Sequence, residues 1–350
     1  MSKHLFPYKW NLADGYPSAN IKKNEYNVFG TFICGGGSTM GYKLAGFNHL
    51  GGVEIDPPIA NVYKTNHKPK HLYNLDIREF NKLIDLPTEL FNLDILDGSP
   101  PCSTFSMAGS REKAWGKEKV FREGQAKQSL DDLVFVYCDT IIKLQPKVFL
   151  LENVKGIIQG NAKVYSKNIV KKMTDAGYNV QVFCLNAASM GVPQKRERVF
   201  FIGHKKEYSL PKLKLEFNEV AIPFGEVKTE DNGKPIKGKM LELWKVKLKG
   251  EKDLANACIR ETGKRSYFGT KIQSDNETPF TIIASDSSPI VHENKPFELS
   301  NDEIKQIGTY PLDYNFKSIE PKYLIGMSVP PVMTAQIANQ IKLQWLDKIK

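Results

Sequence analysis

Cysteine is scarce in this chain of 350 residues, and its spacing is informative. The five cysteines are Cys34, Cys102, Cys138, Cys184 and Cys258, and no two of them form a CxxC pair. An odd count without paired spacing argues against a disulfide framework and against a structural zinc site, and it favours a reducing compartment. We therefore expect no metal site in this protein.

Long apolar runs are also absent. No stretch approaches ~18 uninterrupted apolar residues, the length that a membrane-spanning helix needs. The N-terminal residues "MSKHLFPYKWNLADG" contain no apolar segment of the kind that signal peptides have. With 41% hydrophobic and 25% charged residues, the composition is that of an ordinary globular protein. We expect a cytoplasmic protein that is neither secreted nor associated with a membrane.

Acidic residues are fewer than basic ones, 39 against 49, which gives a net charge of +10. A basic excess favours an anionic partner, with nucleic acid the first candidate, although many basic proteins bind none. Residues 205–277 are rich in lysine, and within them "WKVKLKG" at 244–250 alternates strictly. The alternation predicts a strand with Trp244 on one face. Its other face would carry Lys245, Lys247 and Lys249, either as a solvated surface or as a row of phosphate contacts.

Five apolar segments are typical of buried strands, and helical patterns lie between them. The predicted strands cover 27–34, 49–56, 90–101, 146–156 and 198–204. Apolar residues spaced by three and four predict a helix over 129–145 and another in the C-terminal residues 330–349. This alternation predicts an α/β fold with a Rossmann-like, doubly wound sheet. Ligands of such a sheet bind beyond the carboxyl ends of its strands.

A glycine-rich loop follows the first predicted strand, in "FICGGGSTMGYKLAGF" at 32–47. A strand, glycines and then a helix form a backbone cradle for a nucleotide-like ligand. The GxGxxG spacing does not fit, so the loop favours a nucleoside without a pyrophosphate. Glu54, at the end of the next strand, could accept both hydroxyls of a ribose, and Asp76 could meet an adenine amino group. The alternative is that these residues are turn glycines and surface acids.

Four segments occur in one order along the chain, and together they resemble a known family. They are the glycine loop, "DGSPPCSTFS" at 97–106, "LLENVKG" at 150–156 and "PQKRERVFFIG" at 193–203. This combination resembles the cytosine-C5 DNA methyltransferases that use S-adenosylmethionine. The resemblance covers nearly the whole chain except about 205–277, with a weaker closing match in "YLIGMSVPPVM" at 323–333.

The resemblance implies a catalytic set of Cys102, Glu152, Arg196 and Arg198. C5 of cytosine is a poor nucleophile until a thiolate adds at C6, which makes Cys102 the expected nucleophile. By resemblance Glu152 would donate a proton to N3, Arg198 would hold the cytosine O2, and Arg196 would brace the active-site loop. We expect both arginines to lie on one strand and face the same way. The target base must be flipped out of the duplex.

The resemblance also implies a cofactor site, a DNA surface and a division into domains. S-adenosylmethionine would contact Phe32, Gly35, Gly37, Glu54, Ile55, Asp76, Ile77, Pro100, Leu133, Ser328 and Val329. Double-stranded DNA would contact Ser103, Ser106, Arg111, Lys245, Lys247, Lys249, Arg260 and Arg265. Residues 1–204 with 322–350 would form the catalytic and cofactor-binding domain, and 205–321 a smaller inserted target-recognition domain. We expect a monomer, associated with the nucleoid if the source is bacterial.

The sequence departs from the family pattern at several positions. Cys34 stands where a glycine is usual, Ser103 replaces the glutamine after the cysteine, and Met327 replaces an asparagine. None of these changes removes a reacting group. Two alternatives remain: the same chemistry on a tRNA, or a catalytically silent relative that binds nucleic acid.

Overall fold

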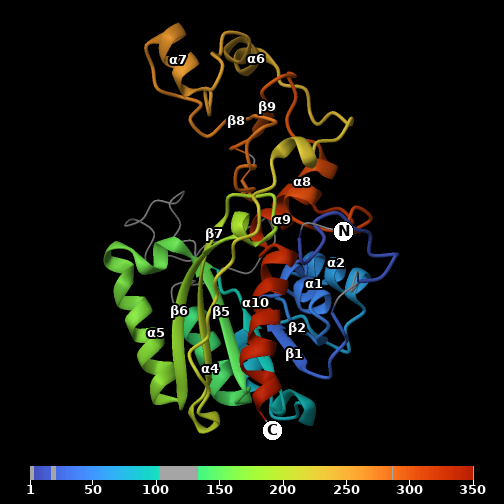
Figure 1. Ribbon diagram of the computed structural model, residues 1–350, viewed down its shortest axis with the longest axis vertical. Helices are drawn as coiled ribbons and strands as arrows, with labels where there is room; N and C mark the ends of the chain where they lie inside the picture. The colour runs from blue at the N-terminus through green and yellow to red at the C-terminus, as the bar shows by residue number, and fades with distance from the viewer. Residues whose placement is uncertain (1–3, 17–20, 102–132, 286, 350) are drawn as a thin grey trace. The chain divides into compact units, whose positions relative to one another are not determined.

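The computed structural model describes residues 4–16, 21–101, 133–285 and 287–349 (Figure 1). The chain divides into two compact units, which are treated separately below. One consists of residues 18–186, 197–216 and 334–350, and the other of 1–17, 187–196 and 217–333. The functional division into 1–204 with 322–350 and 205–321 stays a prediction. No helix in the described ranges is long and apolar enough to cross a membrane.

The first unit is built on a sheet of seven strands within the described residues. The strands are β1 (Asn27–Thr31), β2 (Asn48–Val53), β3 (His71–Tyr73), β4 (Ile95–Gly98), β5 (Val148–Val154), β6 (Tyr178–Asn186) and β7 (Glu197–Lys205). Their order across the sheet is β3-β2-β1-β4-β5-β7-β6. The first five in this order are parallel, whereas β7 pairs antiparallel with both β5 and β6. The predicted α/β sheet is therefore confirmed.

Helices cover both faces of this sheet. They are α1 (Gly37–Leu44), α2 (Pro57–His67), α3 (Ile77–Lys82), α4 (Leu133–Leu144), α5 (Lys163–Asp175) and α10 (Pro331–Gln344), of which α10 belongs to this unit from residue 334 on. Alternate strand residues such as Phe29, Phe149 and Phe201 pack in one core with α3, α4 and α5. The opposite face carries His49, which contacts α1 and α2, and His204, whose ring packs against Trp345 just after α10.

The topological switch point of this sheet lies between the neighbouring strands β1 and β4. From β1 the chain passes to β2 on one side, while β4 lies on the other side of β1. Thr31 and Gly98 are partners in the β1–β4 ladder, and each is the last residue of its strand. The segments that follow these strands therefore start next to each other, at the place where α/β sheets bind their ligands.

The second unit contains short elements around its own small core. Its elements are α6 (Gly238–Lys245), α7 (Ala255–Thr262), β8 (Lys271–Gln273), β9 (Ile290–His292), α8 (Asn301–Ile307) and α9 (Pro321–Met327). Strands β8 and β9 are parallel, and buried side chains of α6, α7 and both strands form one apolar cluster. Residues near the N-terminus belong to this unit, because Trp10 Nε1 donates to the Thr309 carbonyl over 3.1 Å.

The strand predicted for 244–250 is wrong. Trp244 and Lys245 end helix α6, and no strand is assigned to residues 246–250. Met240, Leu243 and Trp244 follow a helical spacing of three and four, and they pack in the unit's core. The alternating segment begins in the last two residues of this helix and continues beyond it. The alternation of lysine and apolar residues therefore does not correspond to the two faces of a strand.

Candidate active site

Glu54 joins the glycine loop to the end of β2. Its Oε2 accepts a hydrogen bond from the Cys34 backbone N–H over 2.9 Å, and its Oε1 accepts one from the Asp56 N–H over 2.9 Å. The carboxyl group is buried, and this burial raises its pKa to about 7. A carboxylate has about four acceptor sites, so Glu54 can accept a further donor, such as a ribose hydroxyl, beside these backbone N–H groups.

The backbone at Cys34 explains why the family pattern has glycine there. Cys34 has a φ of 46°, and Phe32, two residues earlier, has a φ of 53°. Both values lie in the left-handed region that favours glycine. A non-glycine residue in this region costs on the order of 1–3 kcal/mol unless its surroundings hold it. The hydrogen bond from the Cys34 N–H to Glu54 supplies such a restraint. The departure at Cys34 thus leaves the loop conformation intact.

Three of the predicted cofactor residues come together in one apolar cluster. Phe32 follows β1, Ile77 begins α3 and Leu133 begins α4, and they pack together with Val136. Phe32 is partly exposed, whereas Ile77 and Leu133 are buried. An apolar surface beside a carboxylate and a backbone loop is the combination that small-ligand sites use.

Asp76 occupies the N-cap of α3. Its Oδ1 accepts from the Arg78 N–H over 2.7 Å, and its Oδ2 lies 3.2 Å from Arg78 Nη1. The side chain remains about a quarter exposed, at 26%. Nearby, the Asn74 side chain donates to the Glu54 carbonyl over 2.7 Å, which ties the ends of β2 and β3 together. The contact of Asp76 with an adenine amino group stays a prediction.

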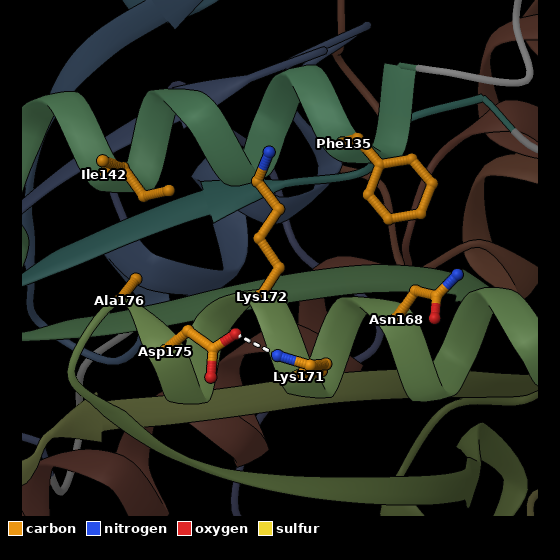
Figure 2. A pocket seen from close by; sticks show the side chains of 7 residues that line it. All are labelled: Phe135, Ile142, Asn168, Lys171, Lys172, Asp175 and Ala176. Carbon is orange, nitrogen blue, oxygen red and sulfur yellow. Dashed lines mark hydrogen bonds and ion pairs between the residues drawn. The ribbon is translucent and has the colours of Figure 1, made fainter.

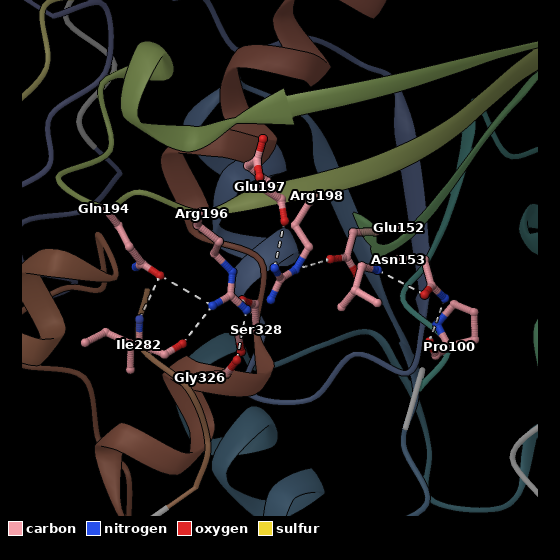
Figure 3. Close-up of polar contacts among 11 residues, drawn as sticks. Pro100, Glu152, Asn153, Gln194, Arg196, Glu197, Arg198, Ile282, Gly326 and Ser328 are labelled. Carbon is pink, nitrogen blue, oxygen red and sulfur yellow. Dashed lines mark hydrogen bonds and ion pairs between the residues drawn. The ribbon is translucent and has the colours of Figure 1, made fainter. Parts of the chain in front are cut away.

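Glu152 and Arg198 form an ion pair at the carboxyl end of β5. Arg198 Nε lies 2.9 Å from Glu152 Oε1, and both side chains are largely buried (Figure 3). The pair exists because β5 and β7 are antiparallel, with Val154 opposite Arg198 and Glu152 opposite Phe200. The two predicted catalytic residues are thus brought together across neighbouring strands.

Arg196 lies just outside β7, which begins at Glu197. The expectation that both arginines share one strand is therefore wrong. The Arg196 guanidinium donates to the carbonyls of Ile282, Gly326 and Ser328 over 2.8–2.9 Å (Figure 3). It is 2% exposed, so it is not a solvated charge. Within the described residues its side chain organises the backbone of the second unit, and its predicted role at the active-site loop is untested.

Gln194 shares this organising role, which the sequence did not indicate. Its Oε1 accepts from the Ile282 N–H over 3.1 Å, and its Nε2 donates to the Ile307 carbonyl over 3.1 Å. The predicted cofactor residue Ser328 lies in the same region. Its hydroxyl accepts from Tyr310 over 2.8 Å and donates to the Leu324 carbonyl over 2.9 Å, and Val329 next to it is also buried.

Two residues around the cysteine segment also escaped sequence reasoning. Asn153 Nδ2 donates to the Pro100 carbonyl over 3.4 Å, and this contact links β5 to the segment that leads to Cys102. Asp97 is buried in β4, with Oδ1 3.4 Å from the Tyr42 hydroxyl and a further hydrogen bond from Ser38. Burial raises the pKa of Asp97 to about 7, and the charge of Glu152 adds to this rise. The sequence did not indicate Asp97 as a site residue because it lies within an apolar run.

Several predicted residues fall outside the described part of the chain. They are Cys102, Ser103, Ser106 and Arg111, so the structure does not test their positions. Of the predicted DNA contacts in the second unit, Lys247 places its ammonium 3.7 Å from the centre of the Trp244 ring. Arg260 pairs with Glu251 over 2.5 Å, and its Nη2 donates to the Val246 carbonyl. Arg265 is exposed.

A pocket of about 530 Å³ lies elsewhere, between α4 and α5 (Figure 2). Phe135 and Ile142 supply apolar walls, while Lys171 pairs with Asp175 over 2.6 Å. Among the described residues, none of those predicted for catalysis, cofactor or DNA lines this pocket. The predicted site residues Glu54 and Glu152 lie instead at the carboxyl ends of the strands β2 and β5.

Comparison with known proteins identifies the family of this chain. The family model described as C-5 cytosine-specific DNA methylase matches residues 26–343. The chain belongs to this family. It is 30% identical to the type II methyltransferase M.FnuDI of Fusobacterium nucleatum, over 91% of this chain and 95% of that protein. It is 27% identical to M.NgoPII of Neisseria gonorrhoeae, over 91% and 96%.

Solved structures confirm the fold of this cytosine-C5 methyltransferase. A Spodoptera frugiperda DNMT2 mutant matches with a TM-score of 0.66 and 17% identity, over 91% of this chain and 99% of that one. A putative DNA modification methyltransferase encoded within an E. coli prophage matches with a TM-score of 0.63 and 19% identity, over the same shares. The family transfers a methyl group from S-adenosylmethionine to C5 of cytosine in DNA, and this is the reaction and cofactor of the chain.

Proposed function

We propose that this methyltransferase acts on a cytosine flipped out of a short duplex DNA target, with Cys102 as the nucleophile. The observation that carries the proposal is the Glu152–Arg198 pair, because an acid held by a cation at a strand end suits recognition of a cytosine ring. The contact of Asn153 with Pro100 supports it, since it joins the strand of Glu152 to the segment that continues to Cys102.

In the proposed mechanism, the Cys102 thiolate adds to C6 of the ring while Glu152, which takes up a proton when the cytosine binds, gives that proton to N3. This converts the ring to an enamine, whose C5 attacks an electrophilic methyl group. S-adenosylmethionine, when bound, would supply that methyl from its sulfonium, and the broken S–CH3 bond would leave the neutral thioether S-adenosylhomocysteine. Arg198 holds the cytosine O2 and keeps Glu152 oriented. Water then takes up the C5 proton, the C5–C6 double bond forms again, the Cys102 sulfur leaves as the thiolate, and the N3 proton returns to Glu152.

The residues that would hold the cofactor fit its nucleoside. Glu54 offers carboxylate oxygens to the ribose hydroxyls, and the cluster of Phe32, Ile77 and Leu133 offers an apolar surface to the adenine. The loop at Gly35 and Gly37, with Ile55, Asp76 and Pro100, completes the proposed set in the first unit. Ser328 and Val329, in the second unit, are proposed as cofactor residues by the resemblance alone.

For DNA, we assign target recognition to residues 205–321, and catalysis and cofactor binding to 1–204 with 322–350. Lys245, Lys249 and Arg265 are the first candidates for phosphate contacts in the recognition segment, because each is exposed. Lys247 and Arg260 would have to leave Trp244 and Glu251. Ser103, Ser106 and Arg111 would contact the DNA from the catalytic side. We propose a cytoplasmic monomer, at the nucleoid in a bacterial source.

Methyl transfer from tritiated cofactor to either duplex DNA or tRNA tests this function. We expect label in DNA only, and none with Cys102→Ser. Label in tRNA alone would mean that tRNA, and not DNA, is the substrate. Label in neither nucleic acid would favour a catalytically silent relative that only binds nucleic acid. Bisulfite sequencing of a plasmid from an expressing strain would then identify the target. Gel filtration with light scattering would test the monomer.

A further inference from the structure

A buried polar cluster lies between α1 and α2, behind the glycine loop. The Thr39 hydroxyl lies 3.1 Å from the Tyr63 hydroxyl and 3.3 Å from His49 Nε2. The ring of Tyr63 packs 4.6 Å from the ring of His67, measured between centroids. All four side chains are buried. Nothing in the methyl-transfer mechanism uses this cluster, although buried polar groups are costly unless they are well paired.

One member of the cluster reaches the glycine loop directly. His67 Nε2 lies 3.4 Å from the Gly35 carbonyl oxygen. A carbonyl can only accept a hydrogen bond, so Nε2 carries the hydrogen and donates it. Burial, together with the charge of Lys43, lowers the pKa of His67 to about 3. The imidazole is therefore a neutral donor throughout the physiological range of pH.

The same imidazole fills the space beside Gly36. Gly36 is the N-cap of α1 and has a φ of 77°. A Cβ built on Gly36 would lie 2.7 Å from His67 Cδ2 and 3.0 Å from His67 Cε1. Glycine is thus required here both by the backbone conformation and by the position of the ring.

The ring has little freedom to move away from the loop. His67 is the last residue of α2, and its carbonyl accepts a hydrogen bond from Lys43 Nζ of α1 over 3.2 Å. Tyr63 packs against one side of the ring, one helical turn earlier. Any shift of the imidazole therefore displaces α1, Tyr63 or the loop itself.

We propose that His67 is a positioning residue for cofactor binding. Its Nε2–H holds the Gly35 carbonyl, and its ring fixes the left-handed turn at Gly36. The loop is then already in the conformation that receives the nucleoside of S-adenosylmethionine. This inference rests on the proposed cofactor site, because it acts only through the backbone of Gly35 and Gly36. His67 itself does not touch the substrate or the cofactor.

The test uses substitutions of His67 that separate the effect of its hydrogen-bond donor from the effect of its side-chain volume. His67→Leu keeps bulk but removes the donor, whereas His67→Gln retains a side-chain N–H. We expect His67→Leu to raise both the dissociation constant and the KM for S-adenosylmethionine about tenfold, with kcat at saturating cofactor and KM for DNA within twofold of wild type. His67→Gln should recover most of the affinity. Lys64→Ala, on the exposed side of α2, is the matched control.

A double-mutant cycle keeps the inference falsifiable if His67→Leu folds poorly. Gly36→Ala should weaken cofactor binding, and His67→Ala should relieve part of that loss, because it removes the ring that the new Cβ meets. Strictly additive effects would overturn the proposal, as would wild-type cofactor affinity in His67→Leu. If Glu54→Ala weakens binding but His67→Leu does not, only this inference fails. If neither weakens binding, the proposed cofactor site itself fails.

Discussion

Arg198 Nε and Glu152 Oε1 are 2.9 Å apart, joined across the antiparallel strands β7 and β5. The Arg198 side chain also donates to the Glu197 carbonyl over 2.8 Å, so the guanidinium is held at two points. The proposed acid and the proposed cation are thus oriented by the sheet. A preorganised pair requires no rearrangement at the moment of reaction, which is how charged groups contribute most to catalysis.

Glu152→Gln should separate proton donation from folding. Glutamine keeps the shape and can still donate a hydrogen bond, but it cannot transfer a proton to N3. We expect the single-turnover rate of methyl transfer to fall about 10²–10⁴-fold, with cofactor affinity within twofold of wild type. Glu197→Gln, an exposed acid on β7 that pairs with Lys155, is the control and should keep the wild-type rate. A Glu152→Gln rate within tenfold of wild type would remove Glu152 from the role of acid.

Arg196→Ala should destabilise the protein rather than act on the chemistry alone. It would leave three carbonyls without their charged donor, those of Ile282 and Ser328, which are buried, and that of Gly326, which is partly buried. We expect a loss of about 3 kcal/mol or more in the free energy of unfolding, measured in urea.

The neighbouring residue provides the control for that experiment. Lys195 is half exposed and lies 3.7 Å from Glu277, so Lys195→Ala should change stability by less than about 0.5 kcal/mol. Equal stability of Arg196→Ala and wild type would mean that the three carbonyls are satisfied in another way.

The sequence was a good guide to the strands because continuous apolar runs mark buried parallel strands. It could not give their direction: "RVFFIGH" has the same pattern in a parallel or an antiparallel strand, and only pairing decides. The family motifs indicated Glu152 and Arg198 as separate site residues, but their ion pair was not predicted. The contacts of Arg196 depend on segments some 86 to 132 positions away. At 244–250 the alternation with a period of two led to the wrong prediction of a strand. The residues that pack in the core are Met240, Leu243 and Trp244, which have helical spacing.

Asp97→Asn should change how stability depends on pH. The folded-state pKa of Asp97 is about 7, above the ordinary value of 3.8 for an aspartic acid, so the folded protein holds a proton that the unfolded chain releases. This contribution to stability is complete below about pH 4 and is lost as pH rises to about 7. Asparagine has no such contribution.

Urea unfolding at pH 5 and pH 8 measures this effect. Asp97→Asn should gain stability relative to wild type between pH 5 and pH 8, on the order of 1–3 kcal/mol. A difference between the two proteins that is the same at both pH values would show that Asp97 is ionised throughout.

Glu54 should make cofactor affinity depend on pH. Its pKa is about 7 in the free protein, and ribose hydroxyls donate best to the ionised carboxylate. Affinity for S-adenosylmethionine, measured by calorimetry, should therefore tighten as pH rises through 7, and Glu54→Gln should flatten the profile. Glu54→Ala should weaken binding by roughly 1.5–3 kcal/mol at pH 8. An unchanged dissociation constant would show that Glu54 only ties Cys34 to Asp56.

The most direct test of the central claim is covalent trapping on duplex DNA that carries 5-fluorocytosine at the target. Fluorine at C5 cannot leave as a proton, so the enzyme should remain bonded to C6 after methyl transfer. The account predicts a shifted band on a denaturing gel, with the wild-type chain and cofactor, whose mass equals protein plus DNA plus one methyl. Peptide mapping should place the bond at Cys102, and Cys102→Ser should give no such band. Absence of the adduct from a protein that methylates unmodified DNA, or its attachment at another residue, would contradict the account.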